Sequence, residues 1–477
     1  MEEITLMTPN STWVSEGNID LDWISAEYYK KIYLEIEQKF SNGNFKIHTF
    51  ENIANINRVT GFEVEKYLEI VENGIPYLRV KNVEECFLNF NDMYYIPQHV
   101  HEKFKKSQFK QNDIALTITG RVGTAAIITD ATTEYNSCQD VVKVSLKESS
   151  NIDPYYLTIY LNSDINYKLL NRFQSGASRP RTLINNVRQI KIPVPSQEIQ
   201  QYIGDKIRKA EILKKEGKES RRIAEQLIYD ALDMSGFEDE ISESKKIKYN
   251  YVEHEDLNDS IDAHYYKRQY MVTNKNIQQR KHTKLKNIGT VDYGYMPMED
   301  YTDKTTGNPM IRVTNMIGNL LLDYSDMKYI SNTIDVPEQK MVSKDDILLV
   351  QCGNTTGKVA YICEDTQRYI FPSFCLRIRV NSDVIDSRYL ALLLELPIMQ
   401  EQIWQTASYS SVRPNTTKPA IQNLKVPIIE KDKQQEIGEL VSKYLSNIYN
   451  AKKLVEEAKQ NIEDLIEGIF DYSRLNV

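Results

Sequence analysis

Two stretches of this chain gather arginine and lysine side chains and contain no acidic residue. They read SRPRTLINNVRQIKIPVP at 178–195 and VRPNTTKPAIQNLKVPI at 412–428. Their basic residues are Arg179, Arg181, Arg188 and Lys191 in the first and Arg413, Lys418 and Lys425 in the second. An arginine guanidinium binds phosphate oxygens, or the O6 and N7 atoms of guanine through two hydrogen bonds. The two stretches therefore predict surfaces that bind DNA, with loops that simply pack on their own globules as the alternative.

The chain as a whole is acidic, with 59 Lys and Arg against 67 Asp and Glu and a net charge of -8 over 477 residues. This balance argues against a protein that coats nucleic acid without specificity, but it leaves room for local basic faces. The length suits two or three domains. We find no secretory signal and no apolar run of the roughly 18 residues that span a membrane. The sequence predicts a cytoplasmic protein without a membrane partner, whose five scattered cysteines are reduced packing residues.

Five blocks recur in the same order at an offset of about 234 residues, which indicates a tandem duplication of a domain-sized unit. The pairs are SAEYYKKIY and DAHYYKRQY, IPYLRVKNV and NPMIRVTNM, NDIALTITGRVGTAAIITD and DDILLVQCGNTTGKVAYICED, DPYYLTIYLNS and DSRYLALLLEL, and RPRTLINNVRQIKIP and RPNTTKPAIQNLKVP. Each unit mixes short β-branched strands, glycine turns and helices, so we expect an α+β globule twice. Asp153 with Pro154 predicts the start of a helix that runs to about Asn171, and Asp386 or Ser387 its equivalent.

A long helix is expected to close each unit. Apolar residues from Ile437 to Ile469 alternate in steps of four and three, the period of a coiled-coil seam. The first helix, near Gln197 to Met234, has a weaker seam with the polar stretch KKEGKESRR in its middle. This stretch is expected to be a solvated face, with a surface that docks a partner protein or contacts DNA phosphates as the alternative. We expect the helix to continue through Gly217, although a glycine inside a helix lowers its stability by about 1 kcal/mol relative to alanine. The predicted boundaries are 1–195 for the first globule, 196–234 for its helix, 235–429 for a polar linker with the second globule, and 430–477 for the last helix.

With these features the chain resembles the specificity subunit of type I restriction-modification systems. The resemblance rests on the repeated YYKKIY and YYKRQY openings, the strand–glycine-turn–strand blocks, the RPRT and RPNT loops, and the passages IPVPSQEIQQYIGDKI and VPIIEKDKQQEIGELV. It implies two target recognition domains separated by two long antiparallel coiled-coil helices. It also implies that each globule reads one half of a split double-stranded DNA target while the helices set the spacer. The partners would be two adenine-N6 methyltransferase subunits, which carry S-adenosylmethionine, and restriction subunits where present. In the docking alternative for KKEGKESRR, the partner would be a methyltransferase subunit.

The resemblance implies no catalysis and no cofactor on this chain, and the sequence agrees, since it contains no methyltransferase, GxxxxGK[ST] or HExxH motif. His99 and His101 are expected to be surface histidines without a metal. Two alternatives stay open: a self-contained restriction or methylation enzyme component, and a two-headed scaffold that binds no DNA.

The candidate DNA-binding residues lie in three pairs of matched segments. Segments shared by both units favour contacts with the DNA backbone, and segments that differ favour reading of bases. The residues are Arg179, Arg181, Arg188, Arg413 and Lys418 in the arginine loops, Arg121, Asn354, Thr355 and Lys358 in the glycine turns, and Arg79, Lys81, Asn82, Arg312 and Asn315 in the RVKN and RVTN blocks. The sequence does not give the target bases or the spacer length.

Overall fold

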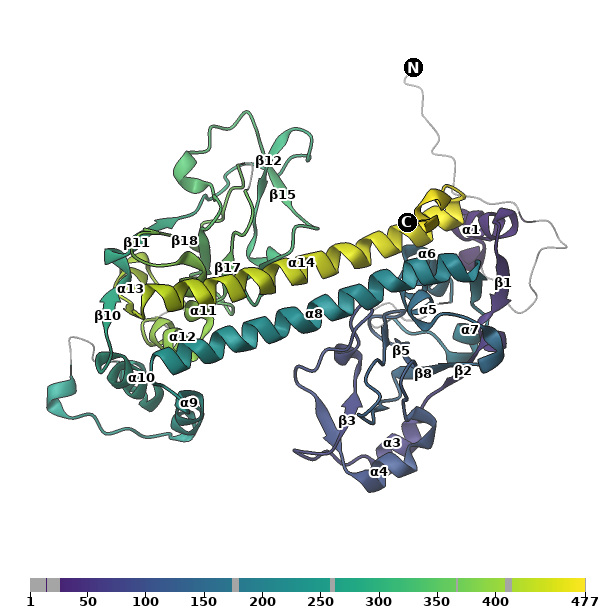
Figure 1. The fold of residues 1–477 in the computed structure, drawn as a ribbon, viewed down its shortest axis with the longest axis horizontal. Helices are drawn as coiled ribbons and strands as arrows, with labels where there is room; N and C mark the ends of the chain where they lie inside the picture. The colour runs from purple at the N-terminus through teal and green to yellow at the C-terminus, as the bar shows by residue number, and fades with distance from the viewer. Residues whose placement is uncertain are drawn as a thin grey trace, which may run out of the picture. The chain divides into compact units, whose positions relative to one another are not determined.

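The computed structural model describes residue 14 and residues 26–173, 180–257, 262–365, 368–407 and 414–476. The chain divides into two compact units. The first unit consists of the described residues up to Leu213 together with 450–476, and the second consists of those in 214–449. Each unit contains an α+β globule and a part of both long helices, as the ribbon in Figure 1 shows. The predicted α+β class and the pairing of the two long helices are confirmed.

The first globule is built on a four-stranded antiparallel sheet in the order β2-β8-β5-β6. A three-stranded sheet, β4-β3-β7, and the pair β1-β9 complete its strands. The strands are β1 Lys46–Thr49, β2 Ala54–Asn57, β3 Ile75–Leu78, β4 Tyr94–Ile96, β5 Ile114–Thr117, β6 Ala125–Ile127, β7 Asn136–Ser137, β8 Val141–Leu146 and β9 Lys191–Val194. The α-helices of the globule are α1 Lys31–Asn42, α2 Phe50–Ile53, α3 Gly61–Tyr67, α4 Gln98–Lys103, α5 Pro154–Leu161, α6 Asp164–Asn171 and α7 Ile184–Arg188.

The second globule repeats this plan with the four-stranded antiparallel sheet β11-β18-β16-β17 and the pair β10-β19. Its strands are β10 His282–Lys284, β11 Gly289–Tyr293, β12 Gly307–Met310, β13 Met316–Gly318, β14 Leu321–Leu322, β15 Lys328–Ser331, β16 Ile347–Val350, β17 Val359–Tyr361, β18 Cys375–Val380 and β19 Lys425–Pro427. Its α-helices are α9 Phe237–Lys246, α10 Arg268–Gln278, α11 Ser387–Glu395, α12 Pro397–Gln405 and α13 Lys418–Gln422.

The strand registers match between the units. Ile114 of β5 lies opposite Val144 of β8, and Ile347 of β16 lies opposite Ile378 of β18. All four residues of β5 and all four of β16 are buried, which explains why both strands read as continuous apolar runs. The duplication in the sequence therefore extends to sheet order and register.

The helix predicted from Asp153 to about Asn171 is two helices. Asp153 caps α5 as predicted, because its carboxylate accepts hydrogen bonds from the backbone N–H groups of Tyr155 and Tyr156. The chain leaves the helix after Leu161, and the Ser163 hydroxyl caps α6 by accepting from the Asn166 N–H. The second globule has the same break, between α11, capped by Asp386, and α12.

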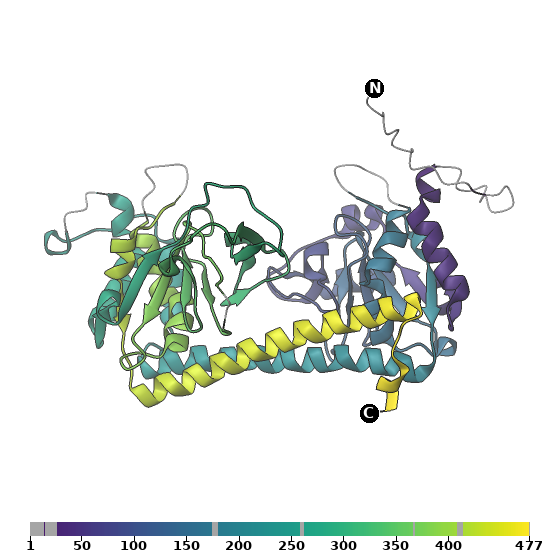
Figure 2. The ribbon, with the colours of Figure 1, turned by 90° about the horizontal axis from the view of Figure 1, so that it is seen from above.

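The two long helices are α8 Gln197–Ala231 and α14 Lys431–Glu467, and both ribbons run without a break in Figures 1 and 2. In the first unit Ile203 and Ile207 of α8 share a core with Val455 and Ile462 of α14. In the second unit Ala224 and Ile228 of α8 share one with Ile437 and Val441 of α14. The start of α8 thus packs on the end of α14, and the end of α8 packs on the start of α14. The two helices therefore pair antiparallel.

The last apolar residue of the predicted α14 seam, Ile469, lies beyond the end of the helix. Gly468 has a φ of 75° and ends the helix, with its N–H bonded to the Leu465 carbonyl and the next N–H bonded to the Asp464 carbonyl. Ile469 therefore lies outside the helix, and its side chain is 70% exposed.

The polar stretch KKEGKESRR in α8 is only partly a solvated face. Gly217 and Ser220 are buried, and the Arg221 guanidinium contacts Glu225 and Glu395 at 2.7 and 2.8 Å. A Cβ atom on Gly217 would lie 3.3 Å from both the Asn447 Cβ and the Tyr444 carbonyl oxygen. Glycine at 217 therefore allows α8 and α14 to approach closely, which offsets its low helix propensity.

Replacing Gly217 by leucine is expected to lower the free energy of unfolding by about 1 to 3 kcal/mol, because the new side chain overpacks the contact between α8 and α14. The matched control is Lys218→Leu, an exposed position one residue further along the helix. Urea denaturation of both variants measures the difference. Equal stability of the two would mean that the helices are not in close contact at Gly217.

The segment predicted as a polar linker, 235–250, contains the helix α9. Its residues Phe237 and Ile241 lie in the core of the second unit. The i, i+4 spacing of these two apolar residues is typical of a helix face that packs on a core. The many charged residues around them made the segment look like a polar linker.

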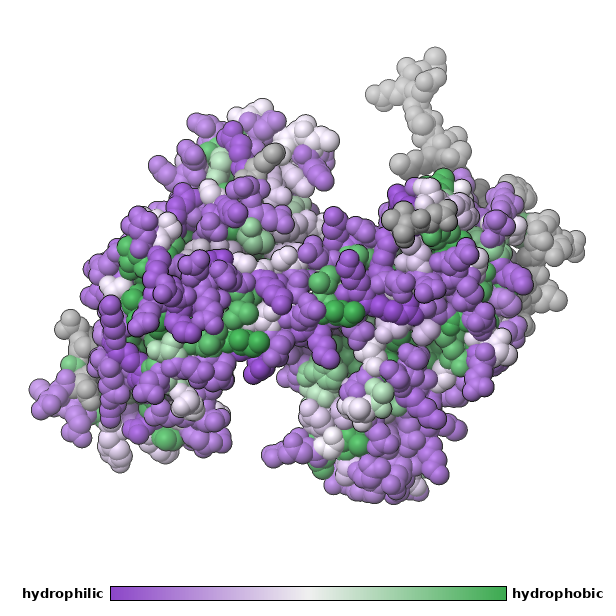
Figure 3. Space-filling view, viewed as in Figure 1, coloured by the Kyte–Doolittle hydropathy of each residue, from purple (hydrophilic) through white to green (hydrophobic). Residues whose placement is uncertain are grey.

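In the part of the chain that the structure describes, none of the helices has the length and apolar character to cross a bilayer. Hydrophilic side chains cover most of the face drawn in Figure 3, and hydrophobic ones appear there in scattered areas.

Candidate nucleic-acid interface

The glycine turn and the arginine loop of the first globule are hydrogen-bonded to each other. The Gly120 N–H donates to the Pro180 carbonyl at 2.9 Å, and the Thr182 N–H donates to the Ile118 carbonyl at 3.0 Å. Thr119 and Arg181 consequently face each other in an antiparallel β-bridge. Two segments that the sequence offered as separate candidates therefore form one surface.

The second globule makes the same connection. The Gly353 N–H donates to the Pro414 carbonyl at 2.9 Å, and the Thr416 N–H donates to the Gln351 carbonyl at 2.8 Å. The Thr356 hydroxyl adds a hydrogen bond to the Pro414 carbonyl at 3.2 Å. Gly120 and Gly353 have φ values of 75° and 95°, which only glycine adopts without strain, so the glycines are needed to bring each turn against its loop.

The third pair of candidate segments, around RVKN and RVTN, joins the same surfaces. The Arg121 guanidinium donates to the Val80 carbonyl at 3.2 Å in the first globule. The Lys358 ammonium donates to the Met316 carbonyl at 3.1 Å in the second. All three predicted segments thus meet on one side of each globule.

Arg79 and Arg312 make equivalent contacts within the RVKN and RVTN hairpins of the two globules. The Arg79 guanidinium lies 3.3 Å from the centre of the Tyr94 ring and donates to the Asp92 carbonyl. Arg312 donates to the carbonyl of Asp326 at 2.7 Å and pairs with its carboxylate at 2.5 Å. Lys81 pairs with Asp92 at 2.7 Å, and the hydrogen bond from Lys81 lowers the pKa of the Asp92 carboxyl. These contacts hold the guanidinium groups against the protein.

Asn82 and Asn315 are buried, and their amides are occupied by the backbone. The Asn82 Oδ1 accepts from the Arg79 N–H at 3.1 Å, while its Nδ2 donates to the Asn89 and Asn91 carbonyls. Asn315 makes the equivalent bonds to Arg312, Asp323 and Asp326. We therefore assign both asparagines to loop structure and leave them out of the DNA contacts proposed below.

Replacing Asn82 or Asn315 by alanine is expected to cost roughly 1 to 3 kcal/mol of stability, because each hairpin loses three hydrogen bonds made by a buried amide. Asn354→Ala is the control, since Asn354 is exposed. Thermal unfolding of the three variants checks the expectation. A midpoint as low for Asn354→Ala as for the buried pair would contradict the assignment.

The remaining candidates differ in exposure. Arg121, Arg181 and Asn354 are exposed, and Thr355 and Lys358 are half-buried. The Arg188 guanidinium is bound within the globule, donating to the Ile56 carbonyl at 3.0 Å and to Asn185 at 3.1 Å. Arg179 and Arg413, the first arginines of the two loops, lie outside the described residues.

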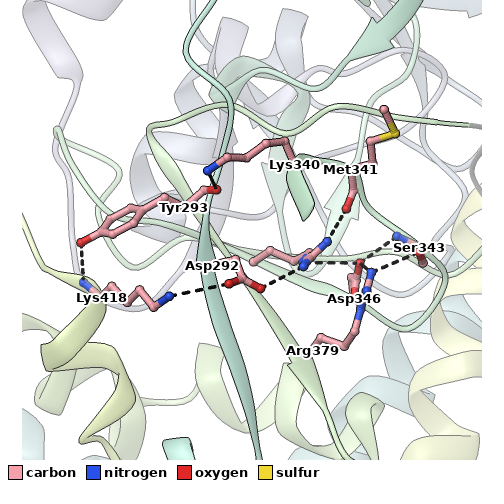
Figure 4. Close-up of polar contacts among 9 residues, drawn as sticks. Asp292, Tyr293, Lys340, Met341, Ser343, Asp346, Arg379 and Lys418 are labelled. Carbon is pink, nitrogen blue, oxygen red and sulfur yellow. Dashed lines mark hydrogen bonds and ion pairs between the residues drawn. The ribbon is translucent and has the colours of Figure 1, made fainter. Parts of the chain in front are cut away.

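Lys418 begins α13 and is held at the edge of the sheet, as Figure 4 shows. The side-chain Nζ of Lys418 lies 3.6 Å from Asp292 Oδ1, and the backbone N–H of Lys418 donates to the Tyr293 hydroxyl at 3.3 Å. The other oxygen of Asp292 accepts from the buried Arg377 at 2.9 Å. Lys418 therefore connects the arginine loop of the second globule to a charged network under its sheet.

Sequence reasoning missed Arg58, which follows β2 and is half-buried beside the first arginine loop. Its guanidinium donates to the Gln139 carbonyl at 3.0 Å. Burial, and then the neighbouring guanidinium of Arg181, lower the pKa of Arg58. The repeat could not reveal this residue, because Arg58 lies outside the five repeated blocks and its equivalent in the second unit, the last residue of β11, is Tyr293.

The histidines fit the expectation only in part. His99 is exposed and lies 3.3 Å from Glu69, as expected for a surface histidine. His101 is instead buried beside Asn136, and burial lowers its pKa. Among the residues that the structure describes, no cluster of three or more His, Cys, Asp or Glu side chains could hold a metal ion.

A family model described as "Type I restriction modification DNA specificity domain" matches the chain at residues 42–222 and again at 278–460. A stretch of 184 residues is 25% identical to the type I restriction enzyme EcoBI specificity subunit of Escherichia coli, over 39% of this chain and 38% of that protein. A stretch of 144 residues is 26% identical to the HindI specificity subunit of Haemophilus influenzae, over 30% of each. The matched stretches thus span less than half the length of these curated relatives.

Among solved structures, the S subunit of the type I restriction-modification system from M. genitalium aligns with 90% of this chain and 97% of its own, at 14% identity and a TM-score of 0.48. The family model covers both repeats and well over half of the residues. The chain therefore belongs to the family of type I restriction modification DNA specificity domains and contains this domain twice.

Proposed function

We propose that this chain is the DNA specificity subunit of a type I restriction-modification complex. Each globule reads one half of a bipartite double-stranded DNA target, and the pair of long helices sets the spacer between the halves. The chain itself performs no catalysis and binds no cofactor. Two adenine-N6 methyltransferase subunits dock on it and carry S-adenosylmethionine, and restriction subunits join them where they are present. Its place of action is the cytoplasm.

The observation that carries this proposal is the repeated surface formed by turn and loop. In both globules equivalent backbone hydrogen bonds join a glycine turn to an arginine loop, and a basic side chain of the turn bonds to the RVKN or RVTN hairpin. Exposed polar residues of that surface are Arg121 and Arg181 in one globule and Asn354 and Asn415 in the other. Guanidinium and amide groups are the side chains that bind DNA backbone and base edges. An acidic chain binds DNA through such local surfaces while its other faces repel the duplex.

DNA binding by the purified complex tests the proposal. The chain is produced together with the methyltransferase encoded beside it, and the complex is titrated with a pool of random duplexes whose bound fraction is sequenced. We expect the bound duplexes to share two short sequences at a fixed spacing. Binding without a shared sequence, or no binding at all, would contradict the proposal and favour a scaffold that holds protein ligands.

A further inference from the structure

The two recognition surfaces can be compared position by position, because equivalent backbone hydrogen bonds fix their correspondence. The Ile118 N–H donates to the Asp140 carbonyl in the first globule, and the Gln351 N–H donates to the Phe374 carbonyl in the second, both at 2.9 Å. The β-bridges pair Thr119 with Arg181 and Cys352 with Asn415. Asp140 therefore corresponds to Phe374, and Arg181 corresponds to Asn415.

The turns and the first sheet strands extend this correspondence. Arg121 follows Gly120, and Asn354 follows Gly353, the two glycines that bond to the loops. Ile56 lies opposite Val144, and Val291 lies opposite Ile378, so Arg58 and Tyr293 are equivalent. We call Arg58, Arg121, Asp140 and Arg181 the first face, and Tyr293, Asn354, Phe374 and Asn415 the second face.

The first face is built from charged groups. Arg121 and Arg181 are exposed, and Arg58, which donates to the Gln139 carbonyl, is close enough to Arg181 and Asp140 for their charges to act on it. Asp140 is the one acidic member, and it accepts a hydrogen bond from the Thr119 hydroxyl at 2.9 Å. The four positions of the first face therefore carry three guanidinium groups and one carboxylate.

The second face has no charged side chain at the four equivalent positions. Tyr293 and Phe374 are 42% and 54% exposed, and Asn354 and Asn415 are also exposed. Three lysines border this face outside the four equivalent positions: Lys418 pairs with Asp292, Lys340 donates to the Tyr293 carbonyl and Lys358 donates to the Met316 carbonyl. Figure 4 shows Lys418 and Lys340 on either side of Tyr293. Arg179 and Arg413, outside the described residues, are the same residue type in both loops and so do not distinguish the faces.

We propose that the two globules bind their half-sites by different chemistry, the first face through ionic contacts of Arg121 and Arg181 with the DNA backbone, and the second through the amides of Asn354 and Asn415 with apolar contact from Phe374. This inference rests on the proposed function and names residues that bind DNA in each half. Guanidinium groups that bind phosphate oxygens neutralise them and release counterions from the duplex. Amides bind adenine at N6 and N7, and an aromatic ring contacts the methyl group of thymine, neither of which releases counterions.

The dependence of binding on salt separates the two chemistries. The complex of this chain with its methyltransferase is titrated with a duplex carrying the methylated motif, at several potassium chloride concentrations. The matched variants are Arg121→Asn with Arg181→Asn, which give the first face the residues of the second, and Asn354→Ala with Asn415→Ala. All four positions are exposed, so the variants are expected to unfold at the wild-type temperature, which is checked first.

We expect the arginine variant to lower the slope of log K against log salt by roughly 1.8, since each lost ionic contact removes about 0.9. The asparagine variant is expected to weaken binding roughly 10-fold or more while its slope stays that of the wild type. Methylome sequencing is expected to show relaxed bases in one half of the motif for the asparagine variant and unchanged bases in both halves for the arginine variant.

If the slope of log K against log salt is unchanged in the arginine variant, the contrast between the faces is overturned. It is also overturned if the slope falls by the same amount in the asparagine variant as in the arginine variant. A wild-type complex that binds the motif no better than a scrambled duplex would instead overturn the proposed function, so the two failures are distinguishable.

Discussion

Replacing Arg377 by alanine is expected to lower the free energy of unfolding of the second unit by about 3 to 5 kcal/mol. Arg377 lies in β18, and its side chain is 4% exposed. Its guanidinium pairs with Asp292 at 2.9 Å, lies 4.0 Å from Asp346 and donates to the Met341 carbonyl. The substitution removes the cation between two carboxylates, leaves a buried carbonyl without a donor and opens a cavity.

Arg379→Ala is the matched control for this prediction. Arg379 pairs with both oxygens of Asp346 at 2.7 Å, but its side chain is 45% exposed, so water replaces much of the lost contact. Chemical denaturation followed by tryptophan fluorescence and by circular dichroism measures both variants. If Arg377→Ala costs less than about 1 kcal/mol, or no more than Arg379→Ala, the network in Figure 4 does not stabilise this sheet.

Exchanging the first globule for that of a relative with another target is expected to change one half of the methylated motif completely and leave the other half unchanged. The expectation rests on the proposed function and on the joint between globule and helix. Gln200 of α8 is buried, accepts from the Asp153 N–H at 3.0 Å and donates to the Pro195 carbonyl at 2.9 Å. Gln434 makes the equivalent bonds to Asp386 and Ile429.

Because the same glutamine joint recurs in both units, we expect that a globule that keeps its aspartate, and the apolar residues that pack on the end of α14, can be joined to α8 after Pro195. The control is the reciprocal exchange of the second globule, which should change only the other half. The motif is determined by sequencing modified bases in cells that carry each chimera. A change in both halves after either exchange would show that the globules do not read DNA independently.

The sequence predicted the parts of the fold that the duplication repeats. The predictions were correct where the same signal appears in both repeats and the apolar residues keep a regular spacing. This holds for the Asp153 cap, the strands around Ile114 and Ile347, and the long helices. The helix break at Ser163 was missed, although serine followed by aspartate is a common helix start, because the apolar pattern continues across it. The helix α9 was missed because its two buried residues lie among charges.

The candidate site could be predicted as a set of segments but not as a set of contacts. The sequence placed Arg121 and Arg181 in separate loops, and only the backbone pairing of Gly120 with Pro180 brings those loops together. Asn82 and Asn315 looked like polar side chains open to DNA, but they satisfy the backbone of their own hairpins. Arg58 and Phe374 carried no signal, since both lie outside the five repeated blocks.

The most direct test of the central claim is the sequencing of modified bases in genomic DNA from cells with and without this gene, with the gene of the proposed methyltransferase partner present in both. The account predicts a split motif with N6-methyladenine in each half that disappears when the gene is deleted. An identical pattern of N6-methyladenine in the two strains would contradict the claim that this chain selects the DNA target.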